Sequence, residues 1–243
     1  MLSERDAERY ERQIRIFGKE GQEKLKNARV FIGGAGGLCG AISLYLAAAG
    51  IGRLRIVDRD TVQLSNLNRQ ILYTDGDLGK GKPGCARERL KSVNPNTEVE
   101  AVTETISEQN INDLVASFDV IVDAMDNFPT RYLLNRAAQA QNIPLFHGAV
   151  ERFYGQATTV IPGKTACLRC IFPTAPPPSS FPIIGSFCGI IGSIQAAEVI
   201  KYITGIGKLL ENKLLMLDGL NSTIEQIDVQ KNRMCEDCGK GRY

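Results

Sequence analysis

Residues 28–58 contain a strand, a glycine-rich turn, a helix and a second strand, and this order constrains the fold more than any other feature. Apolar residues predict the first strand at 28–32 and the helix at 40–49, with Gly33–Gly37 as the turn between them. A second apolar run predicts the next strand at 54–58. Such a βαβ unit places its two strands parallel in one sheet, joined by a right-handed crossover.

The alternation of strands and helices continues along the chain. Periodicity and turn signals predict strands at 99–106, 120–123 and 144–147, and helices at 82–93, 110–117 and 130–141. From Gly155 onward the pattern changes to strands separated by turns, which is typical of antiparallel pairing; these strands are expected at 158–161, 214–218 and 223–229. We therefore predict an α/β fold with a Rossmann-like, largely parallel sheet, helices on both faces and an antiparallel extension.

A chain of 243 residues can form one large domain or two small ones, and no linker is visible in it. We predict a single domain over 1–243, with a helical arm at 1–27, the βαβ core at 28–150 and the extension at 151–243. Five of the ten prolines lie between residues 173 and 182. Because proline is excluded from helices and central strands, this run predicts a mobile crossing loop, and a buried helix is expected after it at 190–203.

The charges of the chain nearly cancel, with 29 basic and 27 acidic residues and a net charge of +2. No global field attracts nucleic acid or an anionic membrane, so neither is predicted as a partner and any anion site must be local. The N-terminal segment is charged where a signal peptide would be apolar, and no run of apolar residues is long enough to span a bilayer. These features predict a soluble, cytoplasmic protein.

The glycine turn predicts a nucleotide site. Gly34, Gly36 and Gly37 let backbone N–H groups approach a phosphate at the start of a helix, where the helix dipole attracts an anion. Asp58 ends the next strand, at a position from which an acidic side chain commonly binds ribose hydroxyls. Tight packing of helix on strand is the other explanation of the glycines. The motif alone leaves ATP, NAD and FAD open.

Charged residues after other strands favour a triphosphate over a dinucleotide. Arg69 and Lys82 would neutralise a triphosphate, and Asp126 follows the strand at 120–123, where a Mg²⁺ ligand is expected. Taken singly, the two cations fit a solvated surface, and Asp126 beside Asn127 fits a turn. Their shared placement after strands of the sheet favours the functional interpretation.

Four of the seven cysteines form two C-x-x-C pairs, Cys167 with Cys170 and Cys235 with Cys238. In a reducing compartment this spacing is typical of metal binding, and four thiolates complete a tetrahedral zinc site with no open position. We predict a structural zinc knuckle with four cysteine ligands that joins the C-terminus to the domain. Two redox pairs or unrelated core thiols are the alternatives.

The other cysteines and the one histidine are predicted to be structural. Cys188 could be a nucleophile near the start of a helix, but it is better interpreted as a small apolar residue packed among glycines, as are Cys39 and Cys85. His147 lies in an apolar strand and is interpreted as a core residue. With a single histidine, hydrolytic triads and histidine-based metal sites are disfavoured.

Several of these motifs occur together in an order that resembles the ThiF/MoeB/HesA family, which contains bacterial and archaeal relatives of ubiquitin-activating enzymes. The resemblance runs from about residue 9 to 239 without a break. It is carried by Arg9-Tyr10-Glu11-Arg12-Gln13, the glycine turn, Asp58-Arg59-Asp60, Ser65–Gln70, Lys82, Asp126-Asn127, Gly192–Ala196 and the two C-x-x-C pairs.

The resemblance implies ATP-dependent adenylation of the C-terminal glycine of a ubiquitin-like β-grasp sulfur carrier, of the ThiS or MoaD type with a Gly-Gly end, and release of pyrophosphate. It implies ATP, Mg²⁺ and Zn²⁺ as cofactors and Asp126 as the magnesium ligand. Arg12 is similar to the arginine that family members insert into the neighbouring subunit's site, which implies a homodimer. The expected catalytic residues are Arg12, Arg69, Lys82 and Asp126, and the expected nucleotide site is Gly34, Gly36, Gly37, Asp58, Asp60, Ser65, Asn66, Arg69, Lys82, Asp126 and Asn127.

The chain departs from the family pattern in two places. Cys39 replaces the last glycine of the nucleotide turn, although Gly40 follows it. Relatives that carry out sulfur chemistry or thioester transfer have a cysteine in the crossing loop, whereas residues 171–187 contain none. We therefore expect an enzyme that makes the acyl-adenylate and depends on a separate sulfur donor.

Two other functions are kept as alternatives. The βαβ turn with Asp58 also suits an oxidoreductase that uses NAD or FAD. The second alternative is a zinc-stabilised partner subunit that has no catalytic activity. The presence of all the expected catalytic residues in one chain disfavours it; these are Arg12, Arg69, Lys82 and Asp126. The sequence does not name the carrier or its pathway.

Overall fold

One eight-stranded sheet forms the centre of the molecule, with strand order β3-β2-β1-β4-β5-β6-β7-β8. The computed structural model describes residues 1–175 and 182–239, so most of the predicted crossing loop at 173–182 lies outside the described residues. The strands are β1 Arg29–Gly33, β2 Arg53–Val57, β3 Glu98–Val102, β4 Val120–Asp123, β5 Leu145–Glu151, β6 Tyr154–Val160, β7 Lys213–Asp218 and β8 Thr223–Asp228.

The pairing of the strands changes once, from parallel to antiparallel, at β5. Strands β3, β2, β1, β4 and β5 are parallel, and β6, β7 and β8 continue the same sheet in antiparallel pairing. This confirms the predicted α/β class with an antiparallel extension. The switch follows from the length of the connection, because β5 and β6 are joined by a tight turn at Arg152 and Phe153, and only antiparallel neighbours can be joined so briefly.

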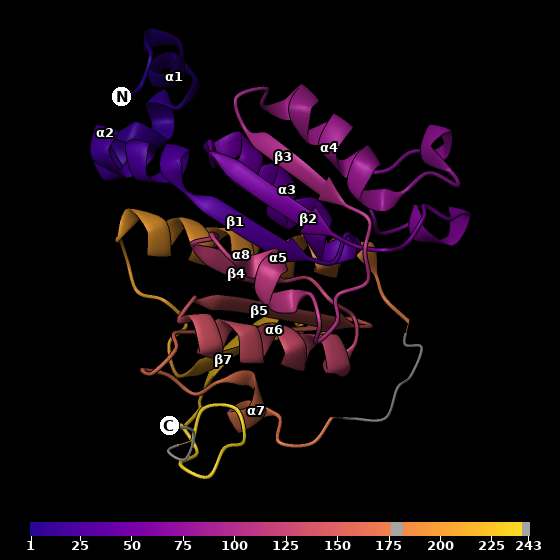
Figure 1. The fold of residues 1–243 in the computed structure, drawn as a ribbon, viewed down its shortest axis with the longest axis vertical. Coiled ribbons are helices and arrows are strands. Elements are labelled where there is room, and N and C mark those ends of the chain that lie inside the picture. Colours follow the sequence, from indigo (N-terminus) through magenta and orange to yellow (C-terminus); the bar gives the residue numbers. More distant parts are fainter. Residues whose placement is uncertain (176–181, 240–243) are drawn as a thin grey trace.

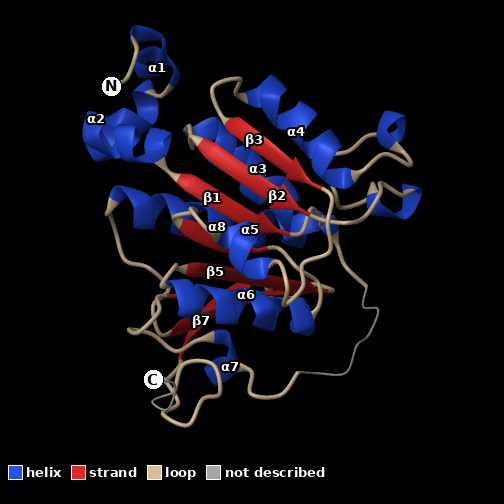
Figure 2. Cartoon of the chain, viewed as in Figure 1, coloured by secondary structure: helices blue, strands red, loops and turns tan. Residues whose placement is uncertain are grey.

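Helices cover both faces of the sheet (Figure 1 and Figure 2). Within the described residues the helices are α1 Glu4–Arg9, α2 Glu11–Asn27, α3 Gly37–Ala49, α4 Lys82–Val93, α5 Ile111–Val115, α6 Phe128–Gln141, α7 Leu168–Ile171 and α8 Gly185–Thr204. Short 3₁₀ turns occur at Leu64–Asn66 and Asp75–Asp77. The N-terminal arm is therefore two helices, and α2 contains a kink at Gly18, whose φ is +72°.

Successive residues of the central strands point into two different cores. Val30 and Ile32 of β1 pack with α3 and α8, whereas Phe31 between them packs with α5 and α6. The same alternation separates Ile121 of β4 from its two neighbours. A strand buried on both faces must be apolar along its middle, which is why residues 30–32 of β1 and 120–122 of β4 form continuous apolar runs, with Arg29 and Asp123 only at strand ends.

Two helices begin earlier than the sequence predicts. The helix expected at 40–49 starts at Gly37, and the helix expected at 190–203 starts at Gly185. Glycine is a poor helix former, so helix propensity alone predicts that both helices start further along the chain. Packing overrides it, because a Cβ at Gly192 of α8 would lie 2.7 Å from the carbonyl oxygen of Leu38 in α3. Glycine at this position lets the two helices touch.

Two strand boundaries also differ from the prediction. The strand expected at 99–106 ends at Val102, and the strand expected at 158–161 begins earlier, at Tyr154. No helix in the described part of the chain combines the length and the apolar character needed to cross a bilayer.

Gly34 should not tolerate a side chain. Its φ is +96°, and a Cβ there would lie 2.7 Å from the carbonyl oxygen of Ala124. We expect Gly34→Ala to destabilise the protein by about 1–3 kcal/mol, since left-handed strain and a backbone clash add. Gly84→Ala is the matched control, because its Cβ would meet nothing within 4 Å; urea unfolding should show no loss there. Equal stability of the two variants would contradict the expectation.

Candidate nucleotide site

A cavity of about 420 Å³ lies at the carboxyl ends of β1, β2 and β4. Its wall includes the glycine turn after β1, Asp58 and Asp60 after β2, and Asp126 and Asn127 after β4. Arg69 and Lys82 also line it. Parallel strands present their carboxyl ends at one edge of the sheet, so residues far apart in sequence meet there. The size falls within the range of small-molecule sites in proteins.

The glycine turn forms the floor of this cavity at the N-terminus of α3. Gly36 is the N-cap of α3 and has no side chain to satisfy the first N–H groups of the helix. Helix N-termini attract anions because their backbone N–H groups and the dipole point at the ligand. A Cβ at Gly37 would lie 2.8 Å from Sγ of Cys188, so the turn also packs closely against α8.

Asp58 connects the turn to the segment that follows β2. Its Oδ2 accepts a hydrogen bond of 2.7 Å from the N–H of Ala35, and its Oδ1 accepts one of 2.8 Å from the N–H of Asp60. The carboxylate lies at the cavity wall, where its remaining lone pairs can accept further bonds. Asp58 therefore both stabilises the turn and offers an acceptor to a ligand.

Lys82 and Arg69 both line the cavity, and nearby oxygen atoms fix the positions of their charged groups. The Nζ of Lys82 lies 3.0 Å from Oδ2 of Asp60, and its side chain is 6% exposed. Arg69 donates through Nη1 to the carbonyl oxygen of Ser65 at 2.8 Å and to Oδ1 of Asn68 at 3.1 Å. Within the described residues Lys82 is paired with a carboxylate and Arg69 is not, so the charge of Arg69 faces an anion without a direct partner, although Asp58 and Asp126 also line the cavity.

Asp126 lies exposed in the turn between β4 and α6. Asn127 caps α6, because its Oδ1 accepts a hydrogen bond of 2.9 Å from the N–H of Thr130, and its Nδ2 donates to Oδ1 of Asp126 at 3.3 Å. The turn-forming and functional interpretations of this pair are thus compatible. A carboxylate with free lone pairs at a strand end is a suitable ligand for Mg²⁺.

Three predicted site residues are not in the wall of this cavity as the described residues form it. Asn66 is buried and accepts a hydrogen bond from the N–H of Gln63 at 3.1 Å, which shapes the turn that presents Arg69. Ser65 contributes its carbonyl oxygen to Arg69. Arg12 lies exposed on α2.

The sequence analysis missed several residues of the cavity wall. Arg131 of α6, Met125 and the segment 104–106 after β3 all line it, and Cys188 does as well. The prediction that Cys188 packs among glycines is confirmed by its 3% exposure, and burial raises the pKa of its thiol while Arg69 lowers it. Arg131 lies four residues after Asn127, and this helical spacing is the signal that could have placed it on the same side.

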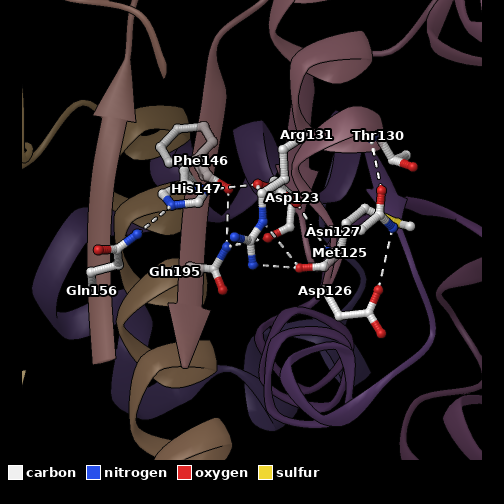
Figure 3. A network of polar contacts seen from close by, with 10 residues as sticks. All are labelled: Asp123, Met125, Asp126, Asn127, Thr130, Arg131, Phe146, His147, Gln156 and Gln195. Atoms are coloured by element: carbon white, nitrogen blue, oxygen red, sulfur yellow. Dashed lines mark hydrogen bonds and ion pairs between the residues drawn. The ribbon is translucent and has the colours of Figure 1, made fainter. Parts of the chain in front are cut away.

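A buried polar network lies behind Asp126 (Figure 3). Asp123, the last residue of β4, is fully buried, and its Oδ2 lies 2.6 Å from Nδ1 of His147 and 3.7 Å from Nε of Arg131. Gln195 of α8 donates through Nε2 to the carbonyl oxygens of Asp123 and Phe146, at 2.8 and 3.0 Å. His147 is therefore a satisfied core residue, as predicted.

The four paired cysteines come together although 64 residues separate the two pairs. Their sulfur atoms all lie within 4.8 Å of one another, with Sγ separations of 3.9 Å for Cys167–Cys170, 3.6 Å for Cys167–Cys235 and 3.4 Å for Cys170–Cys238. Zn–S bonds of about 2.3 Å in a tetrahedron place sulfurs about 3.8 Å apart. The cluster fits a zinc knuckle.

Known proteins resemble this chain over most of its length. The sequence model of the ThiF family matches residues 10–238. The chain is 42% identical over 242 residues to the SAMP-activating enzyme E1 of Haloferax volcanii, covering 96% of this chain and 89% of that protein. It is 41% identical over 247 residues to the sulfur carrier protein adenylyltransferase of Thermus thermophilus, covering 96% and 91%.

A solved structure also resembles it. The crystal structure of E. coli MccB with ATP has a TM-score of 0.84 and 25% sequence identity, and the match covers 98% of this chain and 76% of that one.

The buried histidine should make stability depend on pH. Burial lowers the pKa of His147 below its ordinary value of 6.5, although the hydrogen bond to Asp123 opposes this. As the pH falls through 6.5 the unfolded chain gains a proton that the folded imidazole does not, so the folded state loses stability. We expect the free energy of unfolding to fall between about pH 7.5 and 5.5, and less steeply in His147→Asn. Denaturant unfolding across this range is the measurement, and equal slopes would contradict it.

Proposed function

Because the chain belongs to the ThiF family, we propose that it adenylates the C-terminal carboxylate of a ubiquitin-like sulfur carrier protein, using ATP and releasing pyrophosphate. The observation that carries this proposal is the cavity in which the glycine turn, Arg69, Lys82 and Asp126 meet. Its charges suit a triphosphate with a divalent cation. Relatives named as adenylyltransferases, at about 40% identity, support the same reaction.

The reaction requires positioning more than acid–base chemistry. A C-terminal carboxylate is ionised at neutral pH and can attack the α-phosphorus without a general base. Negative charge accumulates on the phosphates in the transition state, and cations held in place beforehand stabilise it at little reorganisation cost. A chain with one buried histidine can therefore catalyse this step.

Each residue of the cavity has a role in this proposal. The N–H groups of the turn at Gly34, Gly36 and Gly37 approach the nucleotide, and Asp58 binds the ribose. Arg69 and Lys82 bind the phosphates, while Asp126 holds Mg²⁺, which would neutralise phosphate charge. The remaining proposed members of the nucleotide site are Asp60, Ser65, Asn66 and Asn127.

The partner proposed for this site is a small β-grasp carrier that ends in Gly-Gly. One relative is named for activating a SAMP and another for a sulfur carrier protein, which supports this substrate class. Residues 171–187 contain no cysteine, so the sulfur atom comes from a separate donor. An NAD- or FAD-dependent oxidoreductase is disfavoured, because a dinucleotide does not need this concentration of cations.

We propose that residues 1–243 act as one adenylation domain held together at its C-terminus by zinc. The sheet is continuous through strands of the βαβ core and of the extension. The four thiols lie at separations that suit a tetrahedral ion with no open position, so the metal would be structural.

Asp126→Ala should abolish carrier-dependent ATP–pyrophosphate exchange. Removing the metal ligand should lower the rate at least about 100-fold, because neutralisation of the phosphates is lost. Asp113→Ala, an exposed carboxylate of α5, is the control and should exchange at the wild-type rate. Exchange retained by Asp126→Ala would remove Asp126 from the metal site, and a lack of exchange by the wild-type protein with every Gly-Gly carrier would overturn the reaction.

Arg12 is proposed to act in the site of a second copy of the chain. In that arrangement, Arg12→Ala and Asp126→Ala proteins are each inactive, but a mixed dimer retains one complete site. Random mixing should restore about a quarter of wild-type exchange, since half of the dimers are mixed and each has one working site of two. If Arg12 acted within its own chain, mixing would restore nothing.

A further inference from the structure

Asp123 and His147 lie behind the turn that carries Asp126, and Arg131 lies beside them with part of its side chain in the cavity wall. Asp123 ends β4, His147 lies beside it in β5 with the register Asp123↔His147, and Arg131 comes from α6. The side chains of Asp123 and His147 are fully buried and that of Arg131 is 6% exposed. Nothing in the proposed reaction uses them directly.

The network holds the backbone of Met125 at both its N–H and its carbonyl group. The N–H of Met125 donates to Oδ1 of Asp123 at 3.0 Å. The carbonyl oxygen of Met125 accepts two bonds from Arg131, 2.7 Å from Nη2 and 3.2 Å from Nε. This carbonyl belongs to the peptide bond that joins Met125 to Asp126, so Arg131 sets the orientation of that peptide (Figure 3).

His147 completes the arrangement by fixing the carboxylate. Its Nδ1 lies 2.6 Å from Oδ2 of Asp123, and Nε2 of Gln156 lies 3.3 Å from its Nε2. Asp123 can only accept and the amide of Gln156 donates, so the ring carries its proton on Nδ1. The charged groups that face His147 are Asp123 and Arg131, and the ring of Phe172 packs beside it at 6.0 Å.

We propose that Asp123, Arg131 and His147 are positioning residues, which lock the Met125 backbone so that Asp126 is held ready to bind the metal–nucleotide complex. A buried carboxylate is costly unless it is paired, and here its partners are the same groups that hold the turn. Groups that orient a metal ligand in this way commonly change metal affinity by about 10- to 100-fold when removed.

The test compares two replacements of His147 in the full chain. In His147→Asn the side-chain amide can donate from near the former Nδ1 position, whereas His147→Leu fills similar space with no donor. Amide hydrogen exchange at Met125 should quicken at least about tenfold in the leucine variant and stay within about threefold of wild type in the asparagine variant. The amide of Ala124, which donates to the carbonyl oxygen of Gly33 at 2.9 Å, is the internal reference and should not change.

Arg131→Lys is the second variant, should His147→Leu not fold. It keeps a positive charge near Asp123 but lacks the fork that binds the Met125 carbonyl twice. We expect the same local quickening of exchange around Met125 with little change at Ala124. A single histidine also makes the imidazole NMR spectrum unambiguous, and a proton on Nδ1 is expected.

A nucleotide measurement links the network to the site. By titration calorimetry, ATP with Mg²⁺ should bind His147→Leu about tenfold more weakly than His147→Asn, while ATP in EDTA should bind both alike. This readout rests on the proposed function, whereas the exchange readout does not. If wild-type protein binds no ATP, the proposed function fails, and Met125 exchange still decides the positioning role.

Three results would overturn the inference: asparagine and leucine variants that exchange alike at Met125, a proton found on Nε2, or nucleotide affinity that falls equally with and without Mg²⁺. Each would mean that His147 does not position Asp126 through the carboxylate of Asp123.

Discussion

Burial of a parallel sheet on both faces is the constraint on which this structure depends. Strands β1 and β4 must be apolar along their middle, because Val30 and Ile32 enter one core and Phe31 enters the other. Polar side chains stand only at the ends of these strands, at Arg29 and Asp123. Since parallel strands all end at the same edge, the glycine turn after β1 and the first polar residues after β2 and β4 meet there, and a cavity forms among them.

Local electrostatics, not net charge, makes this edge suitable for a triphosphate. The chain as a whole carries only +2. At the cavity, Asp60 holds Lys82 within hydrogen-bonding distance, and Arg69 is held by neutral oxygens of its own turn. Positive charge is thus placed in a fixed geometry before the ligand arrives, which lowers the reorganisation required in the reaction. Behind Asp126, the buried side chains of Asp123 and Arg131 form an ion pair. This pair supports the turn that carries Asp126.

Most of the fold and the main site motifs could be predicted from sequence, and the exceptions have physical causes. The start of α8 at Gly185 was missed, because glycines disfavour a helix unless a neighbour such as α3 packs against them. The sequence did not place Arg131 in the cavity wall, because an arginine in an amphipathic helix is usually interpreted as a surface charge. The roles of all the proposed site residues remain predictions, and of the three that lie outside the cavity wall, Arg12, Ser65 and Asn66, only Asn66 is buried.

The sequence by itself determined the βαβ order, the position of the glycine turn and the pairing of cysteines in C-x-x-C spacing. These depend on local rules of turn chemistry, periodicity and ligand spacing, which act over a few residues. The sequence also predicted that the two pairs share one zinc site, and the tertiary structure supplies the packing that brings them together across 64 residues of chain. Only the tertiary structure decided that Asp123, Arg131 and His147 form one network, because such contacts depend on which strands become neighbours, and hydrophobic burial selects that order across the whole chain.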